Sequence, residues 1–141
     1  MGPRERLNAY FKSVRGKGFV WGSHDCLTFT NDAWRRMYGH GWADEWIGNY
    51  MPDGTVIRRS ELRKELWRLH GANTLEDAID TRWKRVIGVP PLGALVTTKK
   101  ARKWITGVAM GISTGTKAAF LDEVGVIHLP LDEIDQAWIK Q

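Results

Sequence analysis

The stretch FVWGSHDC, residues 19–26, holds the only cysteine of the chain and joins two segments of helical periodicity. Before it, residues 3–15 carry apolar side chains at helical spacing, and Pro3 suits a first helical position. After it, a second apolar stripe is closed by a glycine: Cys26, Phe29, Ala33, Trp34, Met37 and then Gly39. Cys26 is therefore the first residue of a predicted helix. Whether it is a nucleophile is the main question for the function of the chain.

The first half of the chain continues as helices separated by loops. Residues 40–59 are predicted to be a loop, because they contain a clear Pro-Asp-Gly turn and no apolar period. Ser60 is expected to cap a third helix that ends at Gly71. Thr74 is expected to open a short fourth helix that runs to Ile79, with an acidic residue completing a capping box.

After the proline pair at 90–91 the apolar pattern changes to short runs typical of strands. The predicted strands are Ala94–Thr98, Trp104–Ser113, Lys117–Leu121, Val124–Leu129 and Ala137–Lys140. Glycine or acidic residues occupy the turns between them. Helices followed by antiparallel strands predict a single α+β domain over residues 1–141, with N-terminal helices packed on a C-terminal sheet.

The composition of the chain excludes several classes of protein. The chain of 141 residues is 43% hydrophobic, so it can form a core, and no apolar run approaches the length of a membrane span. The N-terminus lacks the apolar run of a signal peptide, so we expect folding in a cytoplasm. A single cysteine excludes an internal disulfide, and no ligand spacing predicts a metal or a cofactor. Eight tryptophans are expected to be mostly core residues, with the rest available for contacts.

Cys26 lies where a helix N-terminus would lower the pKa of a thiol, which favours a nucleophile; an inert small hydrophobic residue is the alternative. Two histidines are candidate bases: His24, two residues before the cysteine, and His128, on a predicted strand. His40 would lie on the order of 20 Å away at the far end of the helix. His70 is expected at the surface, at the C-terminus of the third helix.

The residues Trp21, Gly22, Asp25 and Cys26 form a Trp-Gly-x-x-Asp-Cys motif that resembles the nucleophile motif of the NlpC-type papain-like cysteine peptidases. Those enzymes cut peptide bonds of bacterial cell-wall peptidoglycan. The resemblance covers residues 17–140 and is nearest to small phage proteins encoded among tail genes. It implies a papain-like NlpC-type domain in which Trp21 packs the connector on the helices, Gly22 allows a tight backbone path and Asp25 caps the cysteine helix.

The strand half departs from the family pattern at the positions that carry catalysis. In the run Ala109-Met110-Gly111-Ile112, Ala109 occupies the place of the family's catalytic histidine. The second polar position, which orients that histidine, falls near Leu121. Cysteine catalysis needs a base for the thiol proton and an acid for the leaving amine, so an apolar residue at both positions predicts a large loss of rate.

Two basic clusters stand out in a chain of net charge +5. The residues of the first, between two predicted strands, are Lys99, Lys100, Arg102 and Lys103. Those of the second, at the start of the third helix, are Arg58, Arg59, Arg63 and Lys64. Each is either solvated surface or a contact for an acidic partner or for phosphates.

Three functions remain open. The first, which we favour, is a structural protein of a phage tail (tail tip or tail assembly) that has lost its catalytic histidine, contacts other tail proteins and resides in the virion tail after assembly in the host cytoplasm. The second is an active endopeptidase that cuts host peptidoglycan with Cys26 and with His24 or His128 as base. The third, and least favoured, is a basic nucleic-acid-binding domain.

Overall fold

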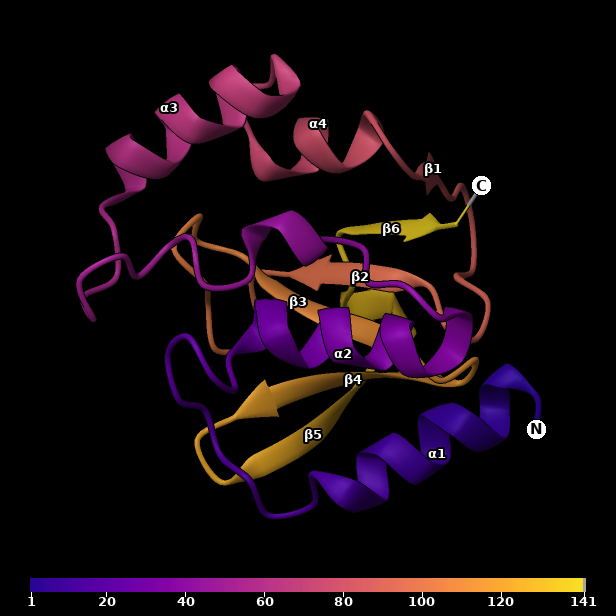
Figure 1. The fold of residues 1–141 in the computed structure, drawn as a ribbon. Helices are drawn as coiled ribbons and strands as arrows, with labels where there is room; N and C mark the ends of the chain where they lie inside the picture. Colours follow the sequence, from indigo (N-terminus) through magenta and orange to yellow (C-terminus); the bar gives the residue numbers. More distant parts are fainter. Residues whose placement is uncertain (141) are drawn as a thin grey trace.

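The computed structural model describes residues 1–140 and shows an antiparallel sheet with helices on one side (Figure 1). Its helices are α1 (Pro3–Ser13), α2 (Cys26–Tyr38), η1 (Asp44–Trp46), α3 (Arg59–His70), α4 (Leu75–Asp80) and η2 (Leu131–Glu133). Its strands are β1 (Lys84–Arg85), β2 (Leu95–Thr98), β3 (Ala109–Ser113), β4 (Lys117–Asp122), β5 (Gly125–Pro130) and β6 (Gln136–Ile139).

The six strands form one sheet in the order β1-β6-β2-β3-β4-β5, and every pair is antiparallel. All six strands lie in the C-terminal half of the chain, and α1 to α4 precede them in the sequence. The predicted α+β class, with N-terminal helices packed on a C-terminal antiparallel sheet, is therefore confirmed.

Helix α2 lies across the sheet and packs against β3, with α1 beside it (Figure 1). Its start is capped by the Asp25 side chain, and its end is set by Gly39 in the left-handed conformation, with φ of 85°. Phe29 and Trp34 on this helix are fully buried, and the Phe11 ring of α1 stacks on Phe29 with 5.9 Å between ring centres. This helix therefore forms the centre of the main core and positions the cysteine.

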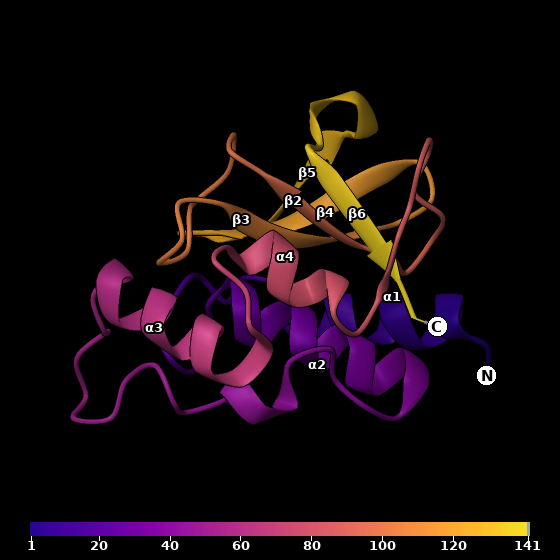
Figure 2. The ribbon, with the colours of Figure 1, turned by 90° about the horizontal axis from the view of Figure 1, so that it is seen from above.

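The sheet buries apolar side chains on both of its faces. Leu95, Met110 and Ile112 belong to the core beneath the helices. The neighbouring Val96 and Ala109 alternate to the opposite face and form a second core with other small and aromatic side chains. Figure 2 shows the helices on one side of the sheet and the yellow segment around η2 on the other, and Leu131 and Ile134 of that segment pack on the second core.

The structure corrects several predicted boundaries. Helix α3 begins at Arg59, so Ser60 lies inside its first turn and does not cap it. The strand predicted from Trp104 begins at Ala109, because Gly107 has a φ of 86° and a turn hydrogen bond runs from the Trp104 N–H to the Val108 carbonyl. The edge strand β1 was not predicted, since two residues carry no periodicity.

Most tryptophans belong to the core, as expected. The buried ones are Trp34, Trp42, Trp46, Trp104 and Trp138. Of the remaining tryptophans, only Trp67, on α3, is largely exposed, at 61%, so few are available for contacts. Among residues 1–140, no helix is both long and apolar enough to cross a membrane.

Gly18 fixes the connector between α1 and α2 against the turn that joins β4 to β5. A Cβ atom on Gly18 would lie 1.8 Å from the Glu123 carbonyl oxygen, and the next residue donates its N–H to the Asp122 carbonyl at 3.1 Å. Gly18→Ala should therefore lower the free energy of unfolding by about 1–3 kcal/mol, as measured by urea unfolding. Gly2→Ala, which meets only the flexible Glu5 side chain, serves as the control. Equal stability of both variants would contradict this packing.

Candidate functional site

The Trp-Gly-x-x-Asp-Cys motif forms a closed turn that leads into α2. Val20 and His24 exchange both backbone hydrogen bonds, at 2.9 and 2.8 Å, which closes the loop. Inside it, Gly22 has a φ of 82°, and a Cβ there would lie 2.5 Å from the Met51 sulfur. Trp21 is half-buried, and its ring meets the edge of Phe19 with 5.0 Å between centres. The closed turn thus fixes the path of the backbone that leads into the first residue of α2.

Asp25 is fully buried, and its carboxylate is surrounded by donors. It accepts hydrogen bonds from the backbone N–H groups of Leu27 and Thr28, both at 3.0 Å, and from that of Gly22 at 2.9 Å. The Tyr50 hydroxyl donates a further hydrogen bond from the 40–59 loop. A buried charge is tolerated when it is hydrogen-bonded in this way. Sequence reasoning missed Tyr50, because no local pattern marks a partner 25 residues away.

The Cys26 thiol is buried in the main core. The residue is 0% exposed, and its Sγ atom lies 3.9 Å from the sulfur of Met110 on β3. Burial raises the pKa of the thiol far above its ordinary value, and the Asp25 charge adds to the increase, while the backbone of Met110 and the N–H groups at the helix start oppose it. Burial outweighs the helix start, so the thiol is neutral.

The residue that faces Cys26 is Met110 and not Ala109. Ala109 points to the opposite face of the sheet, into the second core, because side chains alternate along a strand. Ala109, which the resemblance places at the position of the histidine, therefore does not face the cysteine. Leu121 lies on the helix-facing side and is buried. The sheet thus presents apolar side chains at both positions.

The two candidate bases do not bond to the thiol. His24 places its ring edge against Phe29, with 6.1 Å between ring centres, and its Nε2 atom is buried without a hydrogen-bond partner among residues 1–140. His128 is exposed on β5 and meets the Phe11 ring at 6.4 Å. Since β5 is two strands from β3, His128 lies roughly 10 Å from the strand that faces the cysteine.

The other two histidines stack on tryptophans. His40 stacks on Trp83 with 5.6 Å between ring centres. The His70 side chain is 7% exposed, stacks on Trp46 and accepts a hydrogen bond from the indole N–H at 3.3 Å. The expectation of a surface role for His70 is therefore wrong, because the 40–59 loop covers it. Among residues 1–140, no group of three or more histidine, cysteine or acidic side chains could hold a metal ion.

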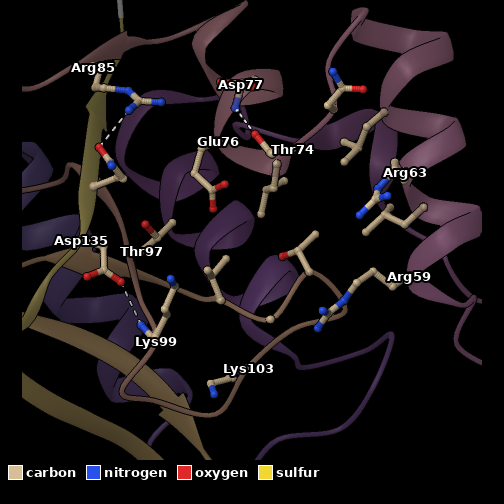
Figure 3. Close-up of a pocket in the computed structure, with 18 residues that line it drawn as sticks. Arg59, Arg63, Thr74, Glu76, Asp77, Arg85, Thr97, Lys99, Lys103 and Asp135 are labelled. Carbon is tan, nitrogen blue, oxygen red and sulfur yellow. Dashed lines mark hydrogen bonds between the residues drawn. The ribbon is translucent and has the colours of Figure 1, made fainter.

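A cavity of about 970 Å³ opens elsewhere, between the helices α3 and α4 and the loop that joins β2 to β3 (Figure 3). Cys26 does not line it. The charged residues that line it are Arg59, Arg63, Glu76, Asp77, Arg85, Lys99, Lys103 and Asp135. This cleft brings together cations from the two basic clusters, which are some 40 residues apart in the sequence.

The first basic cluster divides between two surfaces. Lys99 and Lys103 line the cleft. Arg102 is half-buried, forms an ion pair with Glu123 at 2.6 Å and lies over the Phe19 ring at 4.5 Å. The expected single patch of Lys99, Lys100, Arg102 and Lys103 is therefore not one surface, because Arg102 turns toward the connector.

The Asp25–Tyr50 hydrogen bond should be measurable as a coupling. Tyr50→Phe removes a donor to a buried carboxylate and should lower the free energy of unfolding by about 1–3 kcal/mol. The same change should cost much less in an Asp25→Ala background, as shown by a double-mutant cycle in urea. Tyr38→Phe is the control, since the Tyr38 hydroxyl has no hydrogen bond among residues 1–140. Additive effects would show that the two side chains do not interact.

Stability should also fall on acidification. Burial lowers the pKa of His24, with Lys17 adding to the effect, and burial also lowers that of His70, with Arg82 adding. The unfolded chain then binds more protons than the folded one below the ordinary histidine pKa of about 6.5, so lower pH favours unfolding. We expect the free energy of unfolding to fall from about pH 7.5 to 5.5, and to fall less steeply in His24→Gln. An identical slope in that variant would exclude His24 as a contributor.

Comparison with known proteins assigns a family to the chain. The model of a family described as a domain of unknown function, DUF6950, matches residues 2–139. No curated protein and no solved structure matches the chain. Because the family match spans the helices, the sheet, the buried cysteine and the cleft, the chain belongs to the DUF6950 family.

Proposed function

We propose that this protein is a non-catalytic structural component of a bacteriophage tail, acting at the tail tip or in tail assembly. In this proposal it has a papain-like NlpC-type fold that keeps the cysteine motif without a catalytic base. It resides in the virion tail and contacts other tail proteins. The phage and tail assignments rest on the resemblance of the Trp-Gly-x-x-Asp-Cys motif.

The burial of the Cys26 sulfur is the observation that supports a non-catalytic role most strongly. A cysteine nucleophile needs a thiolate, a base within hydrogen-bond reach and access for the substrate. Here the sulfur is fully buried, lies against Met110 and has a raised pKa. A peptide bond cannot reach a fully buried sulfur unless the core opens locally. These features favour a structural residue over a nucleophile.

The arrangement of the elements supports the proposed fold. The cysteine occupies the first residue of α2, and α2 packs against β3 of an antiparallel sheet. The strand that would supply a base in the family is the one that supplies Met110 here. A fold can keep its architecture after its chemistry is lost, because caps and core packing do not depend on the reacting groups.

The charge distribution does not favour the nucleic-acid alternative. The cleft that holds these cations is also lined by Glu76, Asp77 and Asp135. Binding of a nucleic acid backbone is favoured by a surface of one charge sign, and these carboxylates would repel phosphates. The remaining basic residues are dispersed, and several are ion-paired, as Arg58 is with Glu61.

Thiol reactivity tests the non-catalytic role. Native Cys26 should react with iodoacetamide at least roughly 100-fold more slowly than the urea-unfolded chain at pH 8, because the thiolate is scarce and inaccessible. Purified peptidoglycan should release no soluble fragments with either the wild-type protein or Cys26→Ser. Fast native alkylation together with cleavage that disappears in Cys26→Ser would identify an enzyme and overturn the proposal.

Particle composition tests the tail assignment. In a phage that encodes this protein, mass spectrometry of purified particles should detect it in the tail fraction. Deletion of its gene should give particles with defective or missing tails, and a Cys26→Ser copy should restore them, since a structural role does not need the thiol. Normal tails after deletion, with the protein found only free in the lysate, would refute the tail assignment.

A further inference from the structure

The cleft between α3, α4 and the β2–β3 loop is lined by both cationic and acidic side chains. Arg59 and Arg63 approach it from α3, and Lys99 and Lys103 approach it from the β2–β3 loop (Figure 3). The carboxylates come from other elements: Glu76 and Asp77 belong to α4, and Asp135 precedes β6. In this cavity of about 970 Å³ the α3 side is cationic and the α4 side is acidic, while the Lys99 N–H bonds to the Asp135 carboxylate at 3.1 Å, so both signs meet there.

Four of the five cations that line the cleft form no ion pair among residues 1–140, whereas the fifth, Arg85, pairs with Asp80 at 2.7 Å. Arg63, Lys99 and Lys103 form no ion pair among residues 1–140, in contrast to other basic side chains such as Arg102. Arg59 donates its Nε–H to the carbonyl oxygen of Ile105 at 3.0 Å, which holds its guanidinium group beside the cleft. The cleft therefore gathers positive charge that is positioned but not neutralised.

The floor of the cleft carries hydroxyl groups without partners. Thr97 is 1% exposed, and its Oγ1 atom has no hydrogen-bond partner among residues 1–140; the same holds for the Oγ1 atom of Thr106. Both residues line this cavity. Buried polar atoms are almost always hydrogen-bonded, so two exceptions in one cleft indicate a ligand or solvent that bonds to them. This observation is independent of the charges.

The volume of the cleft and the mixed charge of its lining favour a peptide as the ligand. A cavity of this volume accommodates several residues of an extended chain, whereas a single inorganic anion would fill a small part of it. A polyanion would meet the carboxylates of Glu76 and Asp77. A peptide that carries both an acidic and a basic side chain satisfies both walls, and its backbone N–H and C=O groups can bond to the hydroxyls of Thr97 and Thr106.

We propose that this cleft binds an extended peptide segment of a partner protein. An acidic side chain of the segment faces Arg63 and Lys103, and a basic side chain faces Glu76 and Asp77. The inference deepens the proposed function by giving the structural protein a partner site, and it rests on that function for the identity of the partner. The binding itself is a property of this chain and can be measured without phage particles.

Fluorescence anisotropy with defined peptides tests the site. The probes are fluorescein-labelled alanine-rich octapeptides that carry one Glu and one Lys at separations of one to five residues, with a Gln-for-Glu and Gln-for-Lys counterpart for each. At least one mixed peptide should bind about tenfold more tightly than its counterpart, and Arg63→Gln and Glu76→Gln should each weaken binding about tenfold. Lys64→Gln, next to Arg63 on the same helix and outside the cleft, should leave binding unchanged.

Three results would overturn the proposal. The first is binding of mixed peptides no stronger than that of their glutamine counterparts. The second is displacement of the bound peptide by millimolar inorganic phosphate or by a 12-nucleotide oligothymidylate, which would indicate an anion site. The third is equal weakening by Arg63→Gln and Lys64→Gln, which would indicate non-specific surface charge.

Incorporation of the variants into phage particles distinguishes failure of this inference from failure of the proposed function. Peptide binding that depends on Arg63, in a protein absent from particles, would support the cleft and refute the tail assignment. Conversely, Arg63→Gln protein that binds no peptide but enters tails at the wild-type level would overturn the link between the cleft and the tail partner. Loss of both peptide binding and incorporation in Arg63→Gln, with Lys64→Gln normal in both, is the expected result.

Discussion

The buried carboxylate of Asp25 is the interaction on which the rest of the structure depends. It caps α2, and it accepts hydrogen bonds from the N–H of Gly22 in the connector and from the hydroxyl of Tyr50 in the following loop. Three segments that share no periodicity are thereby fixed to one point. Because α2 is the central helix of the core and packs on β3, its position in turn sets the side of the sheet on which the helices lie.

The same constraint accounts for the state of the cysteine. A thiolate at Cys26 would place a second negative charge next to Asp25 in a fully buried site, so burial and charge both favour the neutral thiol. An apolar strand face then packs against it through Met110. Such a site stabilises the fold as a small hydrophobic residue would, and the motif retains its capping function without a catalytic role.

Some of the basic side chains at the surface form ion pairs and others do not. Arg102 and Arg85 form ion pairs with Glu123 and Asp80 near sheet edges and turns. The unpaired cations of α3 and of the β2–β3 loop converge on a cleft that Arg85 also lines and to which α4 contributes acidic side chains. Since isolated surface ion pairs add little stability, this arrangement bears on recognition more than on folding.

The sequence by itself determined the helices, the α+β class and the cap at Asp25, because caps, glycine ends such as Gly39 and helical periods depend on residues within a few positions of one another. Only the tertiary structure decided that Met110 faces Cys26 and that Tyr50 bonds to Asp25. Those contacts join residues 84 and 25 positions apart. Strand β3 is apolar on both faces, so its sequence shows no alternation that would reveal which side chains face the helices. Only its pairing within the sheet decides which side chain faces the cysteine.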